Sequence, residues 1–257
     1  MIDANALRRM AREGGVQAGV AEKDYAITWL LSDIYASKLS DILVFMGGTA
    51  IRKVYFPGIW RFSEDLDFVC ARRPQKDEIH TGLEEALRLI GESGMIFSID
   101  TLRETEGHIM ARVRYSGSLG SKNSIKIDVR IREKVLLEPV KATVKSNYPD
   151  LDDFKVVVYQ FDEILAEKMR GMLQRGKSRD FYDVWRLTKE RPFDKRKVFD
   201  LFRRKCEFAG VDCDIGKVFD SKHLQAAKEH WERGLAHLTK ELPEFDTVIR
   251  DLRKTLI

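Results

Sequence analysis

Hydrophobic positions recur with two different periods along the chain, and the change between them divides it. Up to about residue 160, short apolar runs end at glycine or proline, which is typical of strands joined by turns. From Asp162 onward, apolar residues recur at helical spacing almost throughout. This distribution predicts an α+β domain over residues 1–160, with N-terminal helices and a mixed sheet, and a helical domain over residues 161–257.

The first part alternates strand-like and helix-like segments. An amphipathic helix is expected over 22–37, where Ile27, Leu30, Leu31 and Ile34 share helical spacing. Strands are expected at 42–46, 66–70, 95–102, 109–115, 124–132 and 156–159, and further helices at 49–56 and at 76–91, ending near Gly91.

The run 124–132 has the clearest alternation in the chain. Its apolar residues occupy one face of the predicted strand, and Asp128 lies on the other, polar face. The apolar set is Ile125, Ile127, Val129 and Ile131, and the polar set is Lys126, Asp128, Arg130 and Arg132.

The second part is predicted to hold helices at 162–175, 179–190, 194–209, 220–241 and 243–256, with Asp162 and Asp194 as N-caps. His223, His230 and His237 recur every seven residues on the fourth of these helices. Seven residues span about 10.5 Å of helix, too far for ligands of one metal ion, so a polar or partner-facing stripe is expected.

Composition narrows the class of protein. The 257 residues are 44% hydrophobic and 33% charged, which favours a folded globular chain. No run approaches the roughly 18 apolar residues of a membrane span, so no membrane partner is expected. Three cysteines form no disulfide framework or zinc motif, which favours a reducing cytoplasm.

Net charge is unevenly distributed. The whole chain has 45 basic and 41 acidic residues, but residues 168–205 hold 14 basic against 5 acidic ones. This excess indicates either a solvated helical surface or a positive face for a polyanion such as nucleic acid or a nucleoside triphosphate.

Three carboxylates carry the candidate chemistry. Asp65 and Asp67 are two residues apart at the start of a predicted strand, so both point to one side with Cα atoms about 6–7 Å apart. Two carboxylates so placed repel each other unless a cation lies between them, and Mg²⁺ or Mn²⁺ with phosphate oxygens suits this geometry. Asp128 is the expected third ligand of a two-metal phosphoryl-transfer site.

Gly47-Gly48-Thr49 follows a predicted strand and precedes a helix. Such a turn leaves amide N–H groups free to meet a phosphate, and Thr49 adds a hydroxyl. The segment has neither the spacing of a P-loop nor that of the three-glycine dinucleotide motif.

The string GGTAIRKVYFPGIWRFSEDLDF resembles the Gly-Gly-Ser/Thr and Asp-x-Asp motif of polymerase β-like nucleotidyltransferases. Together with EKDY (22–25), KIDV (126–129), EILAEKMRGMLQR (163–175) and KSRDFYDVWRL (177–187), the chain resembles the AbiEii/AbiGii toxin family over residues 22–190. The resemblance implies a minimal nucleotidyltransferase core, a toxin with a cognate antitoxin, and an NTP substrate. Some members of that family modify the 3′ end of tRNA, which makes RNA the expected acceptor.

The resemblance also assigns roles to later residues. Lys168 lies on an apolar stripe with Phe161, Leu165 and Met172; it either extends to the surface or, as the family implies, neutralises the triphosphate. Asp180, rather than Asp183, is expected to orient Lys168 or bind nucleotide, the alternative being surface ion pairs.

Arg61 and Ser63 stand just before the paired acids and are expected to reach phosphate. Glu22, Lys23 and Asp24 are assigned only a capping and dipole role at a helix start.

The sequence therefore predicts a metal-dependent transfer of a nucleotide to an acceptor hydroxyl. Two alternatives remain open at this point. A metal-dependent nuclease also uses clustered carboxylates and a lysine, and a binding module for nucleic acid or an antitoxin could keep the fold without catalysis.

Overall fold

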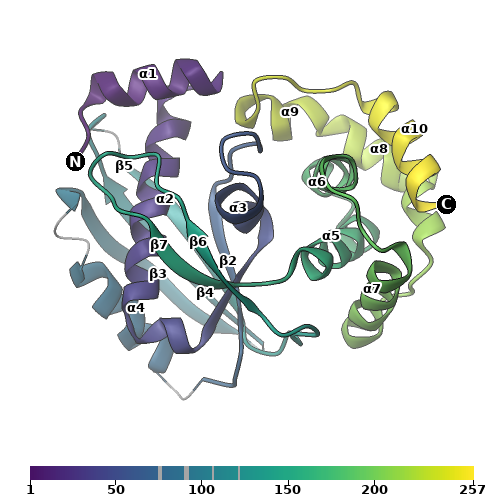
Figure 1. Ribbon diagram of the computed structural model, residues 1–257, viewed down its shortest axis with the longest axis horizontal. Helices are drawn as coiled ribbons and strands as arrows, with labels where there is room; N and C mark the ends of the chain where they lie inside the picture. The colour runs from purple at the N-terminus through teal and green to yellow at the C-terminus, as the bar shows by residue number, and fades with distance from the viewer. Residues whose placement is uncertain (75–76, 90–92, 106, 121) are drawn as a thin grey trace. The chain divides into compact units, whose positions relative to one another are not determined.

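The computed structural model describes residues 1–74, 77–89, 93–105, 107–120 and 122–257 (Figure 1). These residues form two compact units, Met1–Tyr159 and Gln160–Ile257. The first unit is built on a mixed sheet and the second is helical. The predicted α+β class with a mixed sheet is confirmed.

The sheet of the first unit has seven strands among the described residues, in the order β3-β4-β5-β2-β1-β7-β6. β2 pairs antiparallel with β1 on one side and parallel with β5 on the other, so it lies near the centre. The strands are β1 Leu43–Met46, β2 Asp65–Cys70, β3 Ile96–Thr105, β4 His108–Ser116, β5 Lys122–Arg130, β6 Val140–Val144 and β7 Phe154–Val158.

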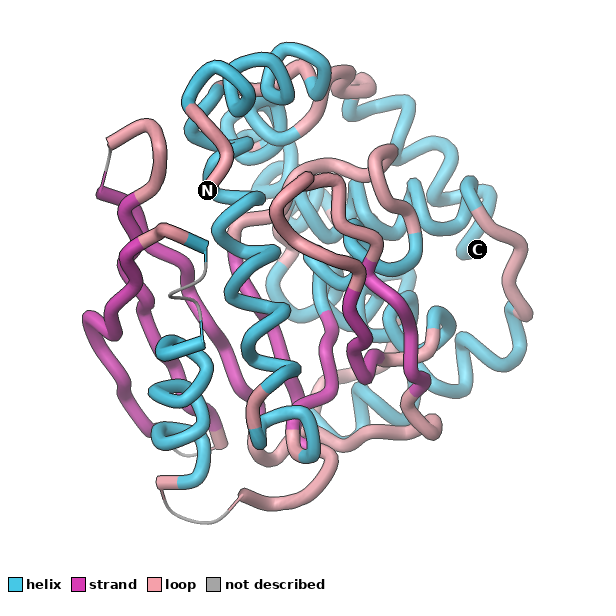
Figure 2. The backbone as a smooth tube through the Cα atoms, turned by 60° about the vertical axis from the view of Figure 1, so that its left-hand side comes forward, coloured by secondary structure: helices cyan, strands magenta, loops and turns pink. Residues whose placement is uncertain are grey.

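Two helices cover one face of this sheet. α2 (Ala18–Ala36) packs on β5, β2 and β7, and α4 (Glu78–Leu89) packs on β3 beside it (Figure 2). The covered face of the strands is apolar: Leu66 and Phe68 of β2 are fully buried. The remaining helical segments of the unit are α1 Ala4–Gly14, η1 Lys38–Asp41, α3 Gly47–Ala50 and η2 Ile51–Tyr55.

The helix expected at 22–37 exists, but it is not amphipathic. α2 begins at Ala18 and is buried almost all round between Ala21 and Ile34, polar residues included. Its buried polar side chains take hydrogen bonds and ion pairs from other segments, so they can lie inside the unit at low cost.

The other strand predictions are accurate to a few residues, with one omission. β6 was not predicted, because an edge strand such as Val140–Val144 is largely exposed and lacks a clear apolar alternation. The expected end of the 76–91 helix near Gly91 lies outside the described residues, and the observed helix runs from Glu78 to Leu89.

The second unit is an assembly of helices around α5 and α6. Its elements are α5 Phe161–Arg175, α6 Ser178–Glu190, α7 Lys195–Ala209, η4 Ile215–Phe219, α8 Ser221–Glu229, α9 Trp231–Leu235, η5 Ala236–Leu238 and α10 Phe245–Leu256. Asp194 is the N-cap of α7, as predicted, and accepts from the amide of Lys197. Asp162 is not a cap, because α5 starts one residue earlier and Gln160 takes the N-cap position.

The single helix expected at 220–241 is divided into α8, α9 and η5. His223, His230 and His237 therefore do not form a stripe on one helix. The Nε2 atom of His223 lies 3.2 Å from the carbonyl oxygen of Leu173. Across the described residues, the helices are too short or too polar to cross a membrane.

Candidate active site

The paired carboxylates lie where the central strands of the first unit meet. Asp65 opens β2, and Asp67 follows two residues later on the same face. β2 and β5 run parallel, and Asp67 is the direct Cα partner of Asp128 across them. Partners in register share a sheet face, so all three carboxylates lie on the face opposite the buried Leu66 and Phe68.

Asp128 already has a cationic neighbourhood. Its Oδ1 lies 3.1 Å from Nδ1 of His108, and its Oδ2 lies 4.0 Å from the ammonium of Lys126. His108 enters through β4, and the sequence offered no signal for it because the contact spans 20 residues. Asp128 therefore already has one partner from β4 and one from its own strand.

The donor set suits a hard divalent cation, since it consists of carboxylate oxygens on neighbouring strands. In the described part of the chain, no three Asp, Glu, His or Cys side chains are grouped closely enough to enclose an ion. The three acids share a face without forming a closed cage, so binding an ion requires side-chain rotation about fixed backbone positions.

The diglycine bend packs directly against Asp67. Gly47 has φ +80°, a backbone conformation that favours glycine. A Cβ at Gly47 would lie 3.0 Å from Cβ and Cγ of Asp67, and closer still to its Oδ2. Glycine is therefore required at position 47 for two reasons: the positive φ angle and the close approach of the Asp67 side chain.

Arg61 and Ser63 lie beside the second glycine. A Cβ at Gly48 would lie 3.0 Å from Nη2 of Arg61 and 3.1 Å from Oγ of Ser63. Arg61 is 3% exposed, and its Nη1 donates to the carbonyl of Phe62 at 3.0 Å. The bend, a guanidinium, a hydroxyl and the Asp67 carboxylate thus form one cluster, as the phosphate-binding prediction requires.

Thr49 has a different place from the one expected. It is 1% exposed, and its hydroxyl donates to the backbone carbonyl of Asp65. This hydrogen bond connects the bend to the start of β2. The hydroxyl proton of Thr49 is therefore donated within the protein and not to a phosphate.

Asp24, from the EKDY segment, lies in a buried charge network behind the bend. Its carboxylate is 3.1 Å from Nε of Arg52 and 2.7 Å from Nζ of Lys53, and it accepts from the Tyr148 hydroxyl at 2.7 Å. Burial by itself would raise the pKa of Asp24, but the Lys53 and Arg52 cations outweigh it and hold that pKa below its ordinary value of 3.8. The expected helix-start capping role is therefore wrong, since the residue lies inside α2 and binds η2.

Arg52 connects this network to the segment that carries Arg61. Its guanidinium donates to the carbonyl of Trp60 and lies 3.6 Å from the ring centroid of Phe62. Glu22 is also buried and accepts from the amide of Leu119 at 2.7 Å. The EKDY segment thus positions loops by buried polar contacts, which no local pattern in the sequence could have revealed.

In the second unit, Lys168 is held by two carboxylates of α6. Its ammonium lies 2.8 Å from Asp183 and 3.5 Å from Asp180. All three residues are at least nine-tenths buried. The alternative of surface ion pairs is wrong for these acids, and Asp183, not Asp180, is the nearer partner of Lys168.

Asp180 is shared with a second cation. It accepts two hydrogen bonds from Arg175, at 2.7 and 2.9 Å. Burial would raise the pKa of Asp180, but the bond from Arg175 and the charge of Lys168 lower it, and the net shift is downward. A Cβ at Gly171 would lie 3.2 Å from Cγ of Asp180, so this glycine lets α5 and α6 approach closely.

The net positive charge around residues 168–205 is lower in the folded structure than the count along the sequence suggests. Several of its cations pair with acids that lie outside the run, which the linear charge count omits. These pairs are Arg170 with Glu167, Lys189 with Asp251, Lys197 with Asp162, and Lys205 with Glu163. The excess that suggested a polyanion-binding face is therefore partly neutralised.

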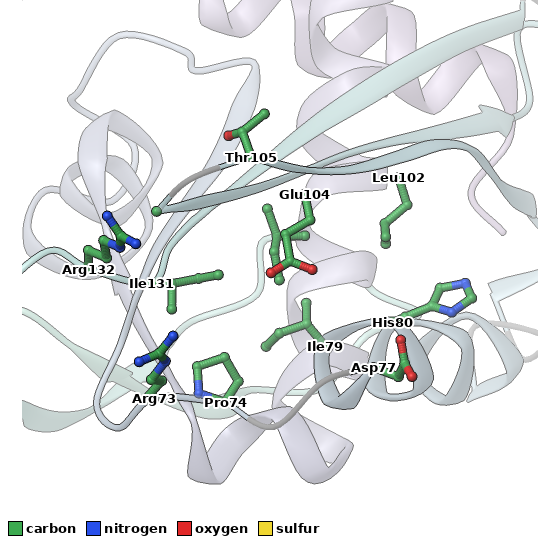
Figure 3. A pocket seen from close by; sticks show the side chains of 12 residues that line it. Arg73, Pro74, Asp77, Ile79, His80, Leu102, Glu104, Thr105, Ile131 and Arg132 are labelled. Carbon is green, nitrogen blue, oxygen red and sulfur yellow. The ribbon is translucent and has the colours of Figure 1, made fainter.

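A pocket of about 440 Å³ lies in the first unit between the start of α4 and the β3–β4 turn (Figure 3). Arg73, His80, Glu104 and Arg132 line it together with apolar side chains such as Ile131. None of the predicted site residues contributes to its lining. Because cationic, anionic and apolar side chains all line the pocket, its lining does not favour one class of ligand over another.

Comparison with known proteins also indicates a nucleotidyltransferase. A family model described as nucleotidyl transferase AbiEii toxin, type IV toxin–antitoxin system, matches residues 29–251. No curated protein matches the chain significantly in sequence.

Two solved structures share the fold. MenT4, a nucleotidyltransferase toxin from Mycobacterium tuberculosis H37Rv, is similar over 100% of this chain and 89% of its own, at 20% identity and a TM-score of 0.71. A proposed nucleotidyltransferase from H. pylori is similar over 94% of this chain and 97% of its own, at 18% identity and a TM-score of 0.56. The family match covers most of the sequence, and the chain belongs to the AbiEii family of nucleotidyltransferase toxins.

Proposed function

We propose that this enzyme uses Mg²⁺ or Mn²⁺ to transfer a nucleotide from an NTP to a hydroxyl of RNA, with the 3′ end of tRNA as the acceptor. The observation that carries the proposal is the register of Asp67 with Asp128 beside the Gly47 bend. This arrangement supports the proposal because the carboxylates that would hold a cation lie next to the glycine bend that would bind a polyphosphate.

Asp65, Asp67 and Asp128 are the residues that would hold the cation. When bound there, a divalent cation neutralises polyphosphate charge and lowers the pKa of the attacking hydroxyl. The chain itself orders the carboxylates: β2 and β5 fix their backbones, and the hydrogen bond from Thr49 to the Asp65 carbonyl fixes the start of β2.

The bend and its neighbours would bind the triphosphate. The glycines let Asp67, Arg61 and Ser63 pack directly against the bend, so that a phosphate bound there would meet backbone amides, a charged donor and a hydroxyl donor together. From the second unit, Lys168 would neutralise phosphate charge, with Asp183 and Asp180 fixing its ammonium.

In the reaction, the acceptor oxygen forms a bond to the α-phosphorus as the bond to the bridging oxygen of pyrophosphate breaks. The hydroxyl proton leaves to solvent or to a nearby carboxylate, and pyrophosphate departs. The protein contributes mainly position and charge stabilisation, as is general for phosphoryl transfer.

Adding a nucleotide to the 3′ end of tRNA would block aminoacylation and so stop translation. A toxin with this activity needs a cognate antitoxin that inhibits it. The family, a type IV toxin–antitoxin family, supports this role. The same family match favours nucleotide transfer over the nuclease and the non-catalytic alternative.

The test is incorporation of each labelled NTP into an RNA pool and into purified tRNA, with and without Mg²⁺. Asp67→Asn is expected to abolish labelling with folding unchanged, whereas Asp152→Asn, at an exposed position outside the sheet, is expected to label normally. Shortened RNA, or undiminished labelling by Asp67→Asn, would contradict the proposal.

A further inference from the structure

The face of the sheet that carries Asp128 continues across β4 and β3. Residues in register share a face, so Arg112 and Arg114 of β4 and Arg103 of β3 lie on the same side as Asp128 and Lys126 of β5. We call the five side chains Arg103, Arg112, Arg114, Lys122 and Lys126 the basic platform; all five are exposed.

The platform exists because buried and outward-facing residues alternate along β4 and β5. In β4 and β5 the other residues, such as Val113 and Ile127, are fully buried under the helices. The outward residues of these two strands do not pack under the helices, and half of them are arginine or lysine. The acidic neighbour of the platform, Asp100, pairs with Arg114.

Arg112 and Lys126 are direct Cα partners across the antiparallel β4–β5 ladder. Like charges at directly opposed positions destabilise a sheet. Lys126 lies 4.0 Å from Asp128, but in the described part of the chain Arg112 makes no ion pair, and neither do Arg103 and Lys122. A polyanion bound across the strands would relieve the repulsion between Arg112 and Lys126.

We infer that the basic platform binds the phosphate backbone of the acceptor RNA and leads its reactive end toward Asp67 and Asp128. The inference rests on the proposed function and names the surface that holds the second substrate. The platform borders the carboxylates directly, since β5 carries both Lys126 and Asp128. Neighbouring strands are about 4.8 Å apart, so the cations cover a strip that a nucleic-acid strand can follow.

The chemistry of the face indicates how the strand is bound. Among the described residues of β3, β4 and β5, the aromatic side chains Phe97 and Tyr115 are register partners, and Tyr115 is buried on the opposite face. The platform thus offers guanidinium and ammonium groups with serine and threonine hydroxyls, and among the described residues of these strands no Phe, Tyr or Trp side chain lies on this face. Such a surface contacts phosphates, binds with a strong salt dependence, and discriminates little between base sequences.

The experiment measures binding of a fluorescein-labelled single-stranded RNA oligonucleotide to the full chain by fluorescence anisotropy at several salt concentrations. The test variant is Arg103→Gln/Arg112→Gln, which leaves Lys126 in place because its ammonium lies 4.0 Å from Asp128. The matched control is Lys141→Gln/Lys155→Gln, which removes two exposed cations from β6 and β7 at the other end of the sheet.

The test variant is expected to raise the Kd for RNA about tenfold and to reduce the slope of log Kd against log salt by about 1.4, for two lost phosphate contacts on a single strand. The control is expected to bind like the wild type. Equal weakening in both variants, or normal binding by the test variant, would overturn the inference. The melting temperature of the test variant should not fall, because a like-charge pair has been removed.

Transfer assays separate this inference from the proposed function. If the platform binds the acceptor, the test variant raises the KM for RNA and leaves the KM for NTP unchanged. Transfer by the wild type with an unaltered KM for RNA in the test variant would refute the platform and leave the proposed function standing. Absence of transfer by the wild type would refute the proposed function, while the anisotropy measurement would still decide on the platform.

Discussion

Asp67 and Asp128 face each other as Cα partners of two parallel strands, although 60 residues of chain separate them. The bend at Gly47, which follows β1, packs against Asp67, and β5 pairs antiparallel with β4 on its other side. The pair therefore depends on the register of the central sheet, which the buried alternate residues of both strands fix. Changes to the register or to the bend should affect chemistry before they affect folding.

Gly47→Ala tests the contact between the bend and Asp67. An alanine at positive φ costs about 1–2 kcal/mol, and its Cβ would also displace the Asp67 carboxylate. We expect transfer activity to be lost, with a loss of unfolding free energy of at least that size in urea titrations. Gly58→Ala is the matched control, because Gly58 has φ +79° with nothing near its Cβ position. Equal activity in the two variants would show that the contact is unimportant.

The sequence predicted the site only where residue positions follow the repeat of a single strand or helix. Asp65, Asp67 and Asp128 could be assigned to the polar face of their strands because side chains alternate between the two faces. The apolar residues between them show which face is buried. The contact of Asp128 with His108 was not predictable, since it depends on which strand pairs with β5. The same holds for Lys168, whose place on an apolar stripe was predicted but whose burial and nearest partner, Asp183, depend on how α5 packs on α6.

The buried network behind the bend gives a stability prediction. Asp24→Asn removes the charge that balances Lys53 and Arg52, both 8% exposed. Removing one partner of a buried ion pair typically costs about 3–5 kcal/mol, because the other charge stays buried and uncompensated. Urea unfolding should show a loss of this order. A loss below about 1 kcal/mol, the usual range of surface pairs, would contradict the structural role given to Asp24.

The same residue predicts a dependence on pH. The pKa of Asp24 in the folded protein lies below its ordinary value of 3.8, so the unfolded chain binds the proton more readily. Its stabilising contribution is complete above about pH 5 and is lost as the pH falls through 3.8 and below. The free energy of unfolding should therefore fall on acidification less steeply in Asp24→Asn than in the wild type or in Asp152→Asn. Parallel pH profiles for all three proteins would argue against the assignment.

The three cysteines should differ in reactivity. Burial raises the pKa of Cys70 to about 11 and that of Cys206 to about 11, which keeps both thiols protonated at neutral pH. Cys213 is exposed. Maleimide should therefore modify Cys213 alone in the folded protein and all three thiols in urea, as mass spectrometry of the intact chain would show. Rapid labelling of Cys70 or Cys206 without denaturant would mean that their elements open readily.

Lys168 has a structural role and a proposed chemical role, and a pair of substitutions separates them. Lys168→Met leaves Asp183 buried without its nearest cation, so we expect a loss of about 3–5 kcal/mol of stability together with loss of transfer. Adding Asp183→Asn removes the carboxylate charge that Lys168 balanced, and the double variant should regain much of that stability in urea titrations. It should not regain labelling of RNA, because the ammonium that neutralises the triphosphate is still missing. If labelling returned along with stability, Lys168 would serve only to hold α5 against α6, and the charge at the triphosphate would have to come from Arg61 and the bound cation alone.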